Sequence, residues 1–134
     1  MEHEIVTKYL GCRFKHLGRD PKEGLDCYGL ILCVYKDFQL DLVDVINYEA
    51  DFALHGKDYF IEHYHEQWFE VPVPHVFDVV LYKTKEGIAN HAGLVIKGNR
   101  CLQATKAGVV ITRLNDPIWF HRQEGFYRFK EKLK

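Results

Sequence analysis

The chain has 134 residues, the size of one ordinary domain, and 47% of them are hydrophobic, which is typical of a folded globular protein. Its 18 basic and 19 acidic residues give a formal net charge of -1, so no basic surplus points to nucleic acid. The longest apolar runs, such as residues 29–35, are far too short to cross a bilayer. Composition therefore argues against nucleic-acid binding and against a membrane span, and predicts a single domain over residues 1–134.

The N-terminus and the cysteines indicate the compartment. Residues 1–4 are polar and acidic and lack the apolar core of a signal peptide, so we expect synthesis in the cytoplasm without a leader. The cysteines are too few and too irregularly spaced for a disulfide framework, and none form a Cys-x-x-Cys pair. Reduced thiols are expected for all four, which are Cys12, Cys27, Cys33 and Cys101.

Helical patterns dominate the first half of the chain. Apolar positions recur at helical spacing in residues 2–10, and a turn is predicted at Arg19-Asp20-Pro21. A second helix is predicted from Cys27 to about Asp37, with Asp26 as its N-cap and with apolar residues nearly all round, as in a buried helix. The mixed aromatic pattern of residues 48–65 predicts one or two surface helices.

Short strands dominate the second half. Runs rich in β-branched and aromatic residues alternate with turn signals. Gly98-Asn99 stands between two of these runs and predicts a tight hairpin. Helices followed by an antiparallel meander predict an α+β fold, with N-terminal helices packed on an antiparallel β-sheet. The predicted strands are residues 68–73, 77–82, 91–97, 100–105, 109–114 and 126–130.

Cys27 is the most informative single residue. At the first turn of a helix, free backbone N–H groups and the positive end of the dipole favour a thiolate, the nucleophilic form of cysteine. Such a nucleophile needs a base and an orienting partner. His91 opens a strand followed by small residues, and the hairpin brings Gln103 near it without directly opposing it. A glutamine carbonyl can fix the imidazole tautomer, leaving one nitrogen for Cys27. The same residues also allow the commoner alternative, a buried structural cysteine.

A zinc site is a further alternative. Three cysteines and two histidines offer suitable ligand types, but no pair has the usual short ligand spacing. We therefore predict no metal and no cofactor; the zinc alternative would use Cys27, Cys33, Cys101, His63 and His65.

Four segments, in order, resemble NlpC-type cell-wall peptidases, most closely the variants carried by phages and prophages. The resemblance covers roughly residues 5–130 and implies a papain-like fold. It also implies hydrolysis of a peptidoglycan stem peptide near the bond from the D-glutamyl residue to the diamino acid. The segments are residues 9–21 with Leu25-Asp26-Cys27-Tyr28-Gly29-Leu30, then Phe77-Asp78-Val79-Val80-Leu81-Tyr82, His91-Ala92-Gly93-Leu94-Val95-Ile96, and Cys101-Leu102-Gln103-Ala104 followed by Gly108-Val109.

The resemblance also implies roles for individual residues. Cys27 would be the nucleophile, His91 the general base and Gln103 the orienting residue, and the backbone N–H of Cys27 would stabilise the oxyanion. Three departures from the family pattern stand out. Gln103 replaces the usual histidine, and Tyr28 replaces a serine that helps to recognise the free amine of the stem peptide. Phe14 and His16 fall in the segment that normally supplies an aromatic residue to the same pocket. The substrate-binding residues implied in the same way are Asp26, Tyr28, Tyr9 and His16.

Three functions follow as expectations. The first is cysteine-dependent cleavage of peptidoglycan at the cell wall, as part of a phage or prophage tail with tail proteins as partners. The second is a non-catalytic assembly or binding module that keeps the fold. The third is an amidase, deamidase or transglutaminase-like acyltransferase acting on another amide, because the same Cys–His pair attacks any accessible amide carbonyl.

Overall fold

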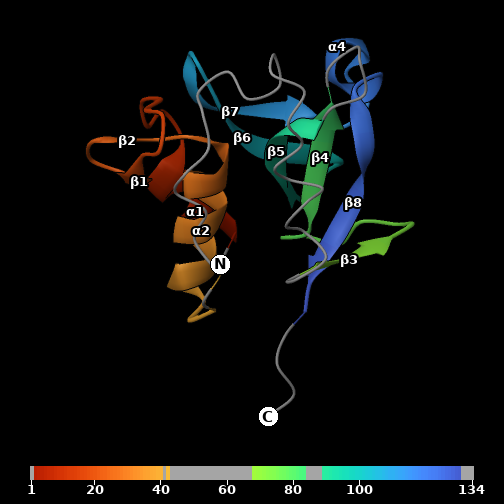
Figure 1. Ribbon diagram of the computed structural model, residues 1–134, viewed down its shortest axis with the longest axis horizontal. Helices are drawn as coiled ribbons and strands as arrows, with labels where there is room; N and C mark the ends of the chain where they lie inside the picture. Colours follow the sequence, from red (N-terminus) through yellow and green to blue (C-terminus); the bar gives the residue numbers. More distant parts are fainter. Residues whose placement is uncertain (1, 41, 43–67, 84–88, 131–134) are drawn as a thin grey trace.

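The computed structural model describes residues 2–40, 42, 68–83 and 89–130, and the helices predicted in 48–65 lie outside them. Within this part, helices lie beside an antiparallel sheet of six strands (Figure 1). The elements are α1 (Glu2–Tyr9), β1 (Arg19–Asp20), β2 (Gly24–Leu25), α2 (Cys27–Asp37), β3 (Trp68–Val71), β4 (Val79–Lys83), β5 (Ala89–Ile96), β6 (Arg100–Thr105), β7 (Gly108–Arg113), α4 (Pro117–Phe120) and β8 (Gln123–Phe129).

The sheet has the order β3-β8-β4-β5-β6-β7. Strands β4 to β7 form the predicted meander. The β5–β6 hairpin turns over residues 97–99, because Ile96 pairs with Arg100, and Gly98 and Asn99 in this turn have positive φ values of 81° and 58°. The meander prediction is wrong for the last strand. β8 does not pair with β7 but returns between β3 and β4, where Tyr127 pairs with Val79 and becomes buried.

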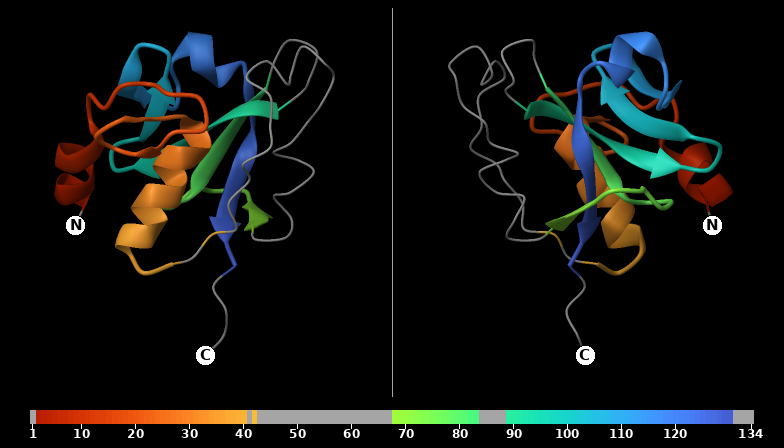
Figure 2. Two further views of the ribbon diagram at one scale, coloured as in Figure 1. Left: turned by 60° about the vertical axis from the view of Figure 1, so that its left-hand side comes forward. Right: turned by 90° about the vertical axis from the view of Figure 1, so that its right-hand side faces the viewer.

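α2 begins and ends at the predicted residues. The side chain of Asp26 accepts a hydrogen bond from the backbone N–H of Gly29 (2.8 Å), which satisfies one of the free donors of the first turn. Figure 2 shows the helix lying across one face of the sheet. The helix is less completely buried than predicted, because Leu32 and Cys33 are only half-buried and Lys36 is exposed. Its buried residues are Tyr28, Gly29, Leu30, Ile31, Val34 and Tyr35.

A short hairpin holds the start of α2 in place. The turn predicted at residues 19–21 is instead the beginning of the two-stranded β1–β2 hairpin, with the turn itself at residues 21–23. Gly29 packs directly against this hairpin segment, since a Cβ at Gly29 would lie 2.0 Å from the carbonyl oxygen of Gly18. The contact explains why a glycine stands in the first turn of α2, where it otherwise lowers helix propensity.

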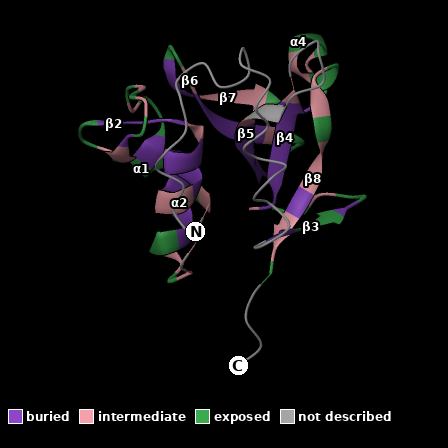
Figure 3. Ribbon diagram, in the orientation of Figure 1, coloured by how far each residue is buried: buried purple, intermediate pink, exposed green. Residues whose placement is uncertain are grey.

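Buried residues cover both faces of the sheet, as the purple strands β4 and β5 show in Figure 3. On one face the strands pack against α1 and α2 in the larger hydrophobic core. The second face carries a smaller cluster around Val80 and Tyr82, against which Trp119 packs from α4. The short helix α4 was not predicted from the sequence; Asp116 caps it, and its carboxylate accepts from the N–H of Ile118 (3.0 Å).

Candidate active site

Cys27 lies where the start of α2 meets the start of β5. The pairing of β5 with β6 begins at Leu94, which leaves the first residues of β5 outside that ladder. There the backbone N–H groups of Ala92 and Tyr28 lie against the Cys27 sulfur and lower the pKa of its thiol. Ala92 directly follows His91, so the fold brings Cys27 next to the chain segment that carries the histidine predicted as base.

Asp26 fixes the position of Cys27 from the other side. It is 4% exposed, and its carboxylate accepts hydrogen bonds from Gly29 N (2.8 Å), Leu17 N (2.9 Å) and the Arg19 guanidinium (3.0 Å). These bonds tie the first turn of α2 to the residues before it. The structure thus gives Asp26 the role of a helix cap and an ion-pair partner, and its contact with a substrate stays a prediction.

His91 and Gln103 are in direct contact, as the hairpin predicted. His91 Nε2 lies 2.6 Å from Gln103 Oε1. Continuing the register of Leu94 with Leu102 by one pair sets Gln103 opposite Gly93, so His91 and Gln103 meet diagonally across the hairpin. A Cβ at Gly93 would lie 3.3 Å from the Cys101 sulfur and 3.4 Å from Gln103 Cβ, so a side chain there would touch both residues.

The contact fixes the proton on His91. A carbonyl oxygen can only accept, so Nε2 of the imidazole donates to Gln103 and Nδ1 is left with a free lone pair. Nδ1 is then available to take a proton from a thiol. This arrangement is that of a general base with an orienting partner.

Two aromatic rings confine the imidazole. Tyr82, paired with His91 across β4 and β5, stacks on it with ring centroids 5.9 Å apart, and Trp119 lies 5.6 Å from it. Sequence analysis missed both residues. The position of Tyr82 could have been found from the pairing of β4 with β5, whereas nothing local to Trp119 shows that α4 folds over His91.

Burial sets the protonation state of the pair. It raises the pKa of the Cys27 thiol to about 12, with the Asp26 carboxylate as the second cause, and the N–H groups of Ala92 and Tyr28 oppose the shift only in part. Burial likewise lowers the pKa of His91 to about 4, although the bond to Gln103 raises it. Desolvation therefore opposes the thiolate that the helix N-terminus favours, and it also opposes a charged imidazole at His91.

Of the remaining predicted substrate-binding residues, two lie near Cys27 or Asp26 and one does not. Tyr28 is buried beside Cys27, with the Arg19 guanidinium 5.7 Å from its ring centroid. His16 is half-buried and directly precedes Leu17, whose N–H bonds Asp26. Tyr9 is not brought to the site: it is 1% exposed in the core, and its hydroxyl donates to Asp37 (2.6 Å) at the opposite end of α2 from Cys27. That correction follows from helix length, since each residue advances the axis by about 1.5 Å.

Neither a metal cluster nor a spanning helix is found in the residues described above. Within residues 2–40, 42, 68–83 and 89–130, no three His, Cys, Asp or Glu side chains are grouped closely enough to hold a metal ion. His63 and His65 of the zinc alternative lie outside that part of the chain. No helix among the same residues is both long and apolar enough to cross a membrane.

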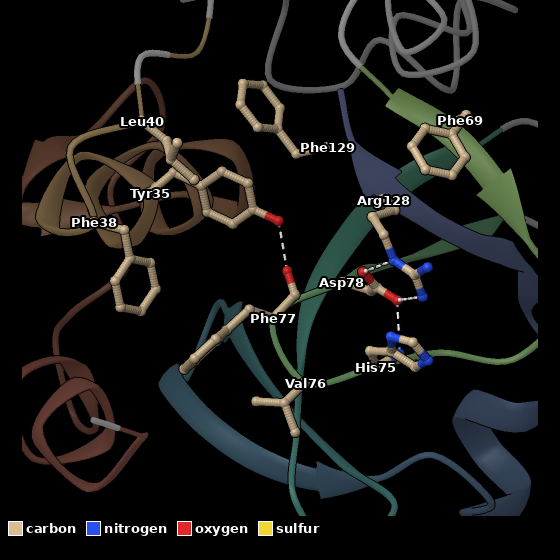
Figure 4. A pocket seen from close by; sticks show the side chains of 10 residues that line it. All are labelled: Tyr35, Phe38, Leu40, Phe69, His75, Val76, Phe77, Asp78, Arg128 and Phe129. Carbon is tan, nitrogen blue, oxygen red and sulfur yellow. Dashed lines mark hydrogen bonds and ion pairs between the residues drawn. The ribbon is translucent and has the colours of Figure 1, made fainter. Parts of the chain in front are cut away.

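A separate cavity of about 670 Å³ lies at the C-terminal end of α2 (Figure 4). Asp78, in one of the segments that carried the family resemblance, binds Arg128 of β8 through two hydrogen bonds of 3.0 and 2.9 Å, and accepts from the backbone N–H of His75 (2.6 Å). These bonds join the start of β4 to β8. The lining residues are Tyr35, Phe38, Leu40, Phe69, His75, Val76, Phe77, Asp78, Arg128 and Phe129, and do not include Cys27, His91 or Gln103.

Comparison with known proteins agrees with this geometry. The model of the NlpC/P60 family matches residues 11–128. Among solved structures, an NLP/P60 family protein similar to a lipoprotein from Staphylococcus aureus subsp. aureus Mu50 superposes with a TM-score of 0.72 at 18% identity, over 98% of this chain and 40% of that one. An NlpC/P60 family protein from Bacillus cereus ATCC 10987 gives 0.70 at 17% identity, over 96% and 40%.

A third structure is close to this chain in length. The NlpC/p60 domain of the peptidoglycan hydrolase SagA gives a TM-score of 0.59 at 17% identity, over 93% of this chain and 92% of that domain. At such identities the likeness shows the fold alone, and it confirms the predicted papain-like α+β class. The chain spans only 40% of the Staphylococcus and Bacillus proteins. No curated protein sequence matches it significantly.

Proposed function

Because this chain belongs to the NlpC/P60 family of cell-wall cysteine peptidases, we propose that it hydrolyses an amide bond of the peptidoglycan stem peptide. The bond that the family resemblance implies joins the D-glutamyl residue to the diamino acid. The observation that carries the proposal is the position of the Cys27 sulfur against the backbone N–H of Ala92. Ala92 directly follows His91, and the contact of His91 with Gln103 fixes the imidazole tautomer. The cell wall is the proposed place of action, because the substrate is found there.

The chemistry proceeds in two halves. The Cys27 sulfur attacks the amide carbonyl carbon while His91 Nδ1 takes the thiol proton, and the backbone N–H of Cys27 stabilises the oxyanion. His91 then gives the proton to the leaving nitrogen, the C–N bond breaks, and a thioester remains. In the second half His91 removes a proton from water, whose oxygen attacks the thioester, and the thiol is restored as the new carboxylate leaves.

Digestion of purified sacculi tests the proposal. Cys27→Ala and His91→Ala should each abolish the release of new amino groups, since nucleophile and base act as a unit. Gln103→Ala should lower the rate by about 10- to 100-fold, because the imidazole remains but loses the partner that holds its tautomer. Cys33→Ala is the matched control, a second half-buried cysteine on α2 whose thiol donates to the Arg19 carbonyl; it should leave the rate within about twofold.

Mass spectrometry of the soluble muropeptides identifies the bond. A new amino terminus on the diamino acid supports the D-glutamyl assignment, and a different new terminus corrects it. Folded wild-type protein that releases nothing from any sacculus contradicts the proposal and favours the assembly-module alternative. Association with a phage or prophage tail is a finer proposal, checked by whether the chain co-purifies with virion particles.

A second candidate is an amidase or acyltransferase acting on another amide, and the surroundings of Tyr28 favour it. Asp26 is already ion-paired with Arg19 (3.0 Å), and the same guanidinium lies over the Tyr28 ring. A carboxylate neutralised in this way attracts a substrate ammonium less strongly than a free one. Release of ammonia or amine from glutaminyl and γ-glutamyl peptides, at a higher kcat/KM than from muropeptides, would select this candidate.

A further inference from the structure

A connected group of polar side chains extends from His91 to the edge of the sheet. Gln103 Oε1 contacts His91, and Gln103 Nε2 donates to Thr112 Oγ1 at 2.6 Å. Thr112 Oγ1 lies 3.2 Å from the Cys101 sulfur, which in turn lies 3.6 Å from the Tyr82 hydroxyl. The Tyr82 ring stacks on His91, so these side chains form a closed ring of contacts. Four neighbouring strands, β4, β5, β6 and β7, thus supply its members, and Gln103 is 0% exposed among them.

The side chain of Gln103 can serve its role in only one of two orientations. Its amide has a carbonyl end that accepts and an NH₂ end that donates, and the two ends have nearly the same shape. With the carbonyl toward His91, Nε2 carries the proton and Nδ1 is free to act as a base. With the NH₂ toward His91, Nε2 must accept, the proton moves to Nδ1, and the imidazole can no longer take the Cys27 proton. A carboxylate has no such ambiguity, because both of its oxygens accept.

Something other than His91 must therefore select the orientation of Gln103. Thr112 is the partner at the other end of the amide. A hydroxyl can donate or accept, so Thr112 distinguishes the two ends only if its own proton is directed elsewhere. The Cys101 sulfur lies 3.2 Å from Thr112 Oγ1, where it can accept that proton. When the Thr112 hydroxyl donates its hydrogen bond to the sulfur, only the lone pairs of Oγ1 face Gln103. These lone pairs can accept from the NH₂ end of the amide but repel its carbonyl end.

We propose that Thr112 is a positioning residue of this active site: its hydroxyl, oriented by Cys101, holds the Gln103 amide so that His91 is kept in the tautomer with Nδ1 free. The inference deepens the proposed hydrolase function and rests on it for its catalytic consequence. Its structural consequence, the tautomer of His91, does not depend on any substrate.

The main variant is Thr112→Val, which has the same shape without the hydroxyl. Thr112 is half-buried on the edge strand β7, and valine is β-branched like threonine, so the strand should be preserved. Imidazole ¹⁵N NMR at pH 7 should show His91 of the wild type protonated at Nε2. In Thr112→Val we expect the Nδ1–H tautomer to rise to a substantial share. The alkylation rate of Cys27 by iodoacetamide should fall by about tenfold, the value of one lost hydrogen bond of ordinary strength.

Two further variants separate positioning from general packing. Thr112→Ser keeps the hydroxyl and should restore the wild-type tautomer and rate. Glu at position 103 has only acceptor oxygens, so adding Thr112→Val to Gln103→Glu should change neither the tautomer nor the alkylation rate relative to Gln103→Glu alone. If Thr112→Val does not fold, the comparison of Thr112→Ser with Thr112→Ala carries the same expectation.

The outcomes distinguish this inference from the proposed function. Folded Thr112→Val with the wild-type tautomer and alkylation rate overturns the positioning role, whatever the protein does to sacculi. An equal loss in the Gln103→Glu background also overturns it, because the effect would then be one of packing. A tautomer shift in a protein whose wild type cleaves no peptidoglycan retains the role of Thr112 and rejects the hydrolase function.

Discussion

At the scale of single residues, burial opposes a charge on both Cys27 and His91. The pKa of Cys27 is raised to about 12 and that of His91 lowered to about 4, both chiefly by burial. Moving the proton from sulfur to imidazole within the pair changes no net charge, so the small ion-paired fraction is independent of pH between those two values. In the proposed mechanism the nucleophile is therefore generated within the pair rather than by exchange with solvent.

The pH dependence of alkylation follows from this pairing. We expect the rate of Cys27 alkylation by iodoacetamide to be flat from about pH 5 to about pH 10 and to fall as His91 protonates near pH 4. For an isolated thiol, the rate below its pKa would instead increase about tenfold for each unit by which the pH is raised. The measurement is modification of the Cys27 peptide by mass spectrometry over a pH series, with Cys27→Ala giving the background of the other three cysteines. A rate that climbs tenfold per unit through neutrality would contradict a coupled pair.

At the scale of elements, the site depends on how α2 meets its neighbours. The start of α2 is held by the Asp26 cap and by the packing of Gly29 against Gly18, and its sulfur then reaches β5 at Ala92. β5 in turn presents His91 to Gln103 on β6. Two close approaches thus position the site, Gly29 against Gly18 and His91 against Gln103.

Gly29→Ala tests the first of these approaches. The new Cβ would lie 2.0 Å from the Gly18 carbonyl oxygen, a backbone atom that cannot turn aside. We expect a loss of more than about 2 kcal/mol in the free energy of unfolding by urea, together with a loss of hydrolysis as Cys27 shifts. Gly11→Ala is the matched control: nothing lies within 4 Å of its Cβ, and its φ of +86° should cost only about 1 kcal/mol. Equal losses in the two variants would mean that the Gly29 contact is not what fixes α2.

At the scale of the whole molecule, buried titratable groups limit the pH range of stability. His91 has a folded pKa of about 4, below its unfolded value near 6.5, so the unfolded chain binds the proton more readily and stability falls as the pH drops through that interval. Cys27 has a raised folded pKa, so its contribution is lost as the pH rises from about 9 toward 12. Burial also raises the pKa of Tyr9, Tyr35 and Tyr82, which steepens the alkaline loss.

Urea unfolding across pH should therefore show a plateau between about pH 6.5 and pH 9. On the acid side His91 should account for a decline on the order of 3 kcal/mol between pH 6.5 and pH 4. His91→Gln, which cannot be protonated, should flatten that arm and leave the alkaline arm unchanged. An acid arm of the same depth in wild type and variant would show that His91 is not buried as a neutral base.

What the sequence determined lies close together along the chain. Asp26 and Cys27 specify the start of α2, because capping depends on a side chain and an N–H group three residues apart. Gly98-Asn99 specifies where the chain turns back, so the sequence could predict that Gln103 comes near His91. It could not predict the register: three residues, 97–99, form the turn, and this pairing places Gln103 on the same face as His91.

What only the tertiary structure decided depends on which distant surfaces meet. The insertion of β8 beside β4, the cover that Trp119 gives His91 and the approach of Thr112 to Gln103 all come from packing between separate elements. The same holds for the charge state of Cys27. A helix N-terminus taken alone favours a thiolate, but burial of the sulfur against β5 removes the water that would solvate the charge. Local geometry depends on residues that are close in the sequence, whereas desolvation depends on how the whole fold packs around a group.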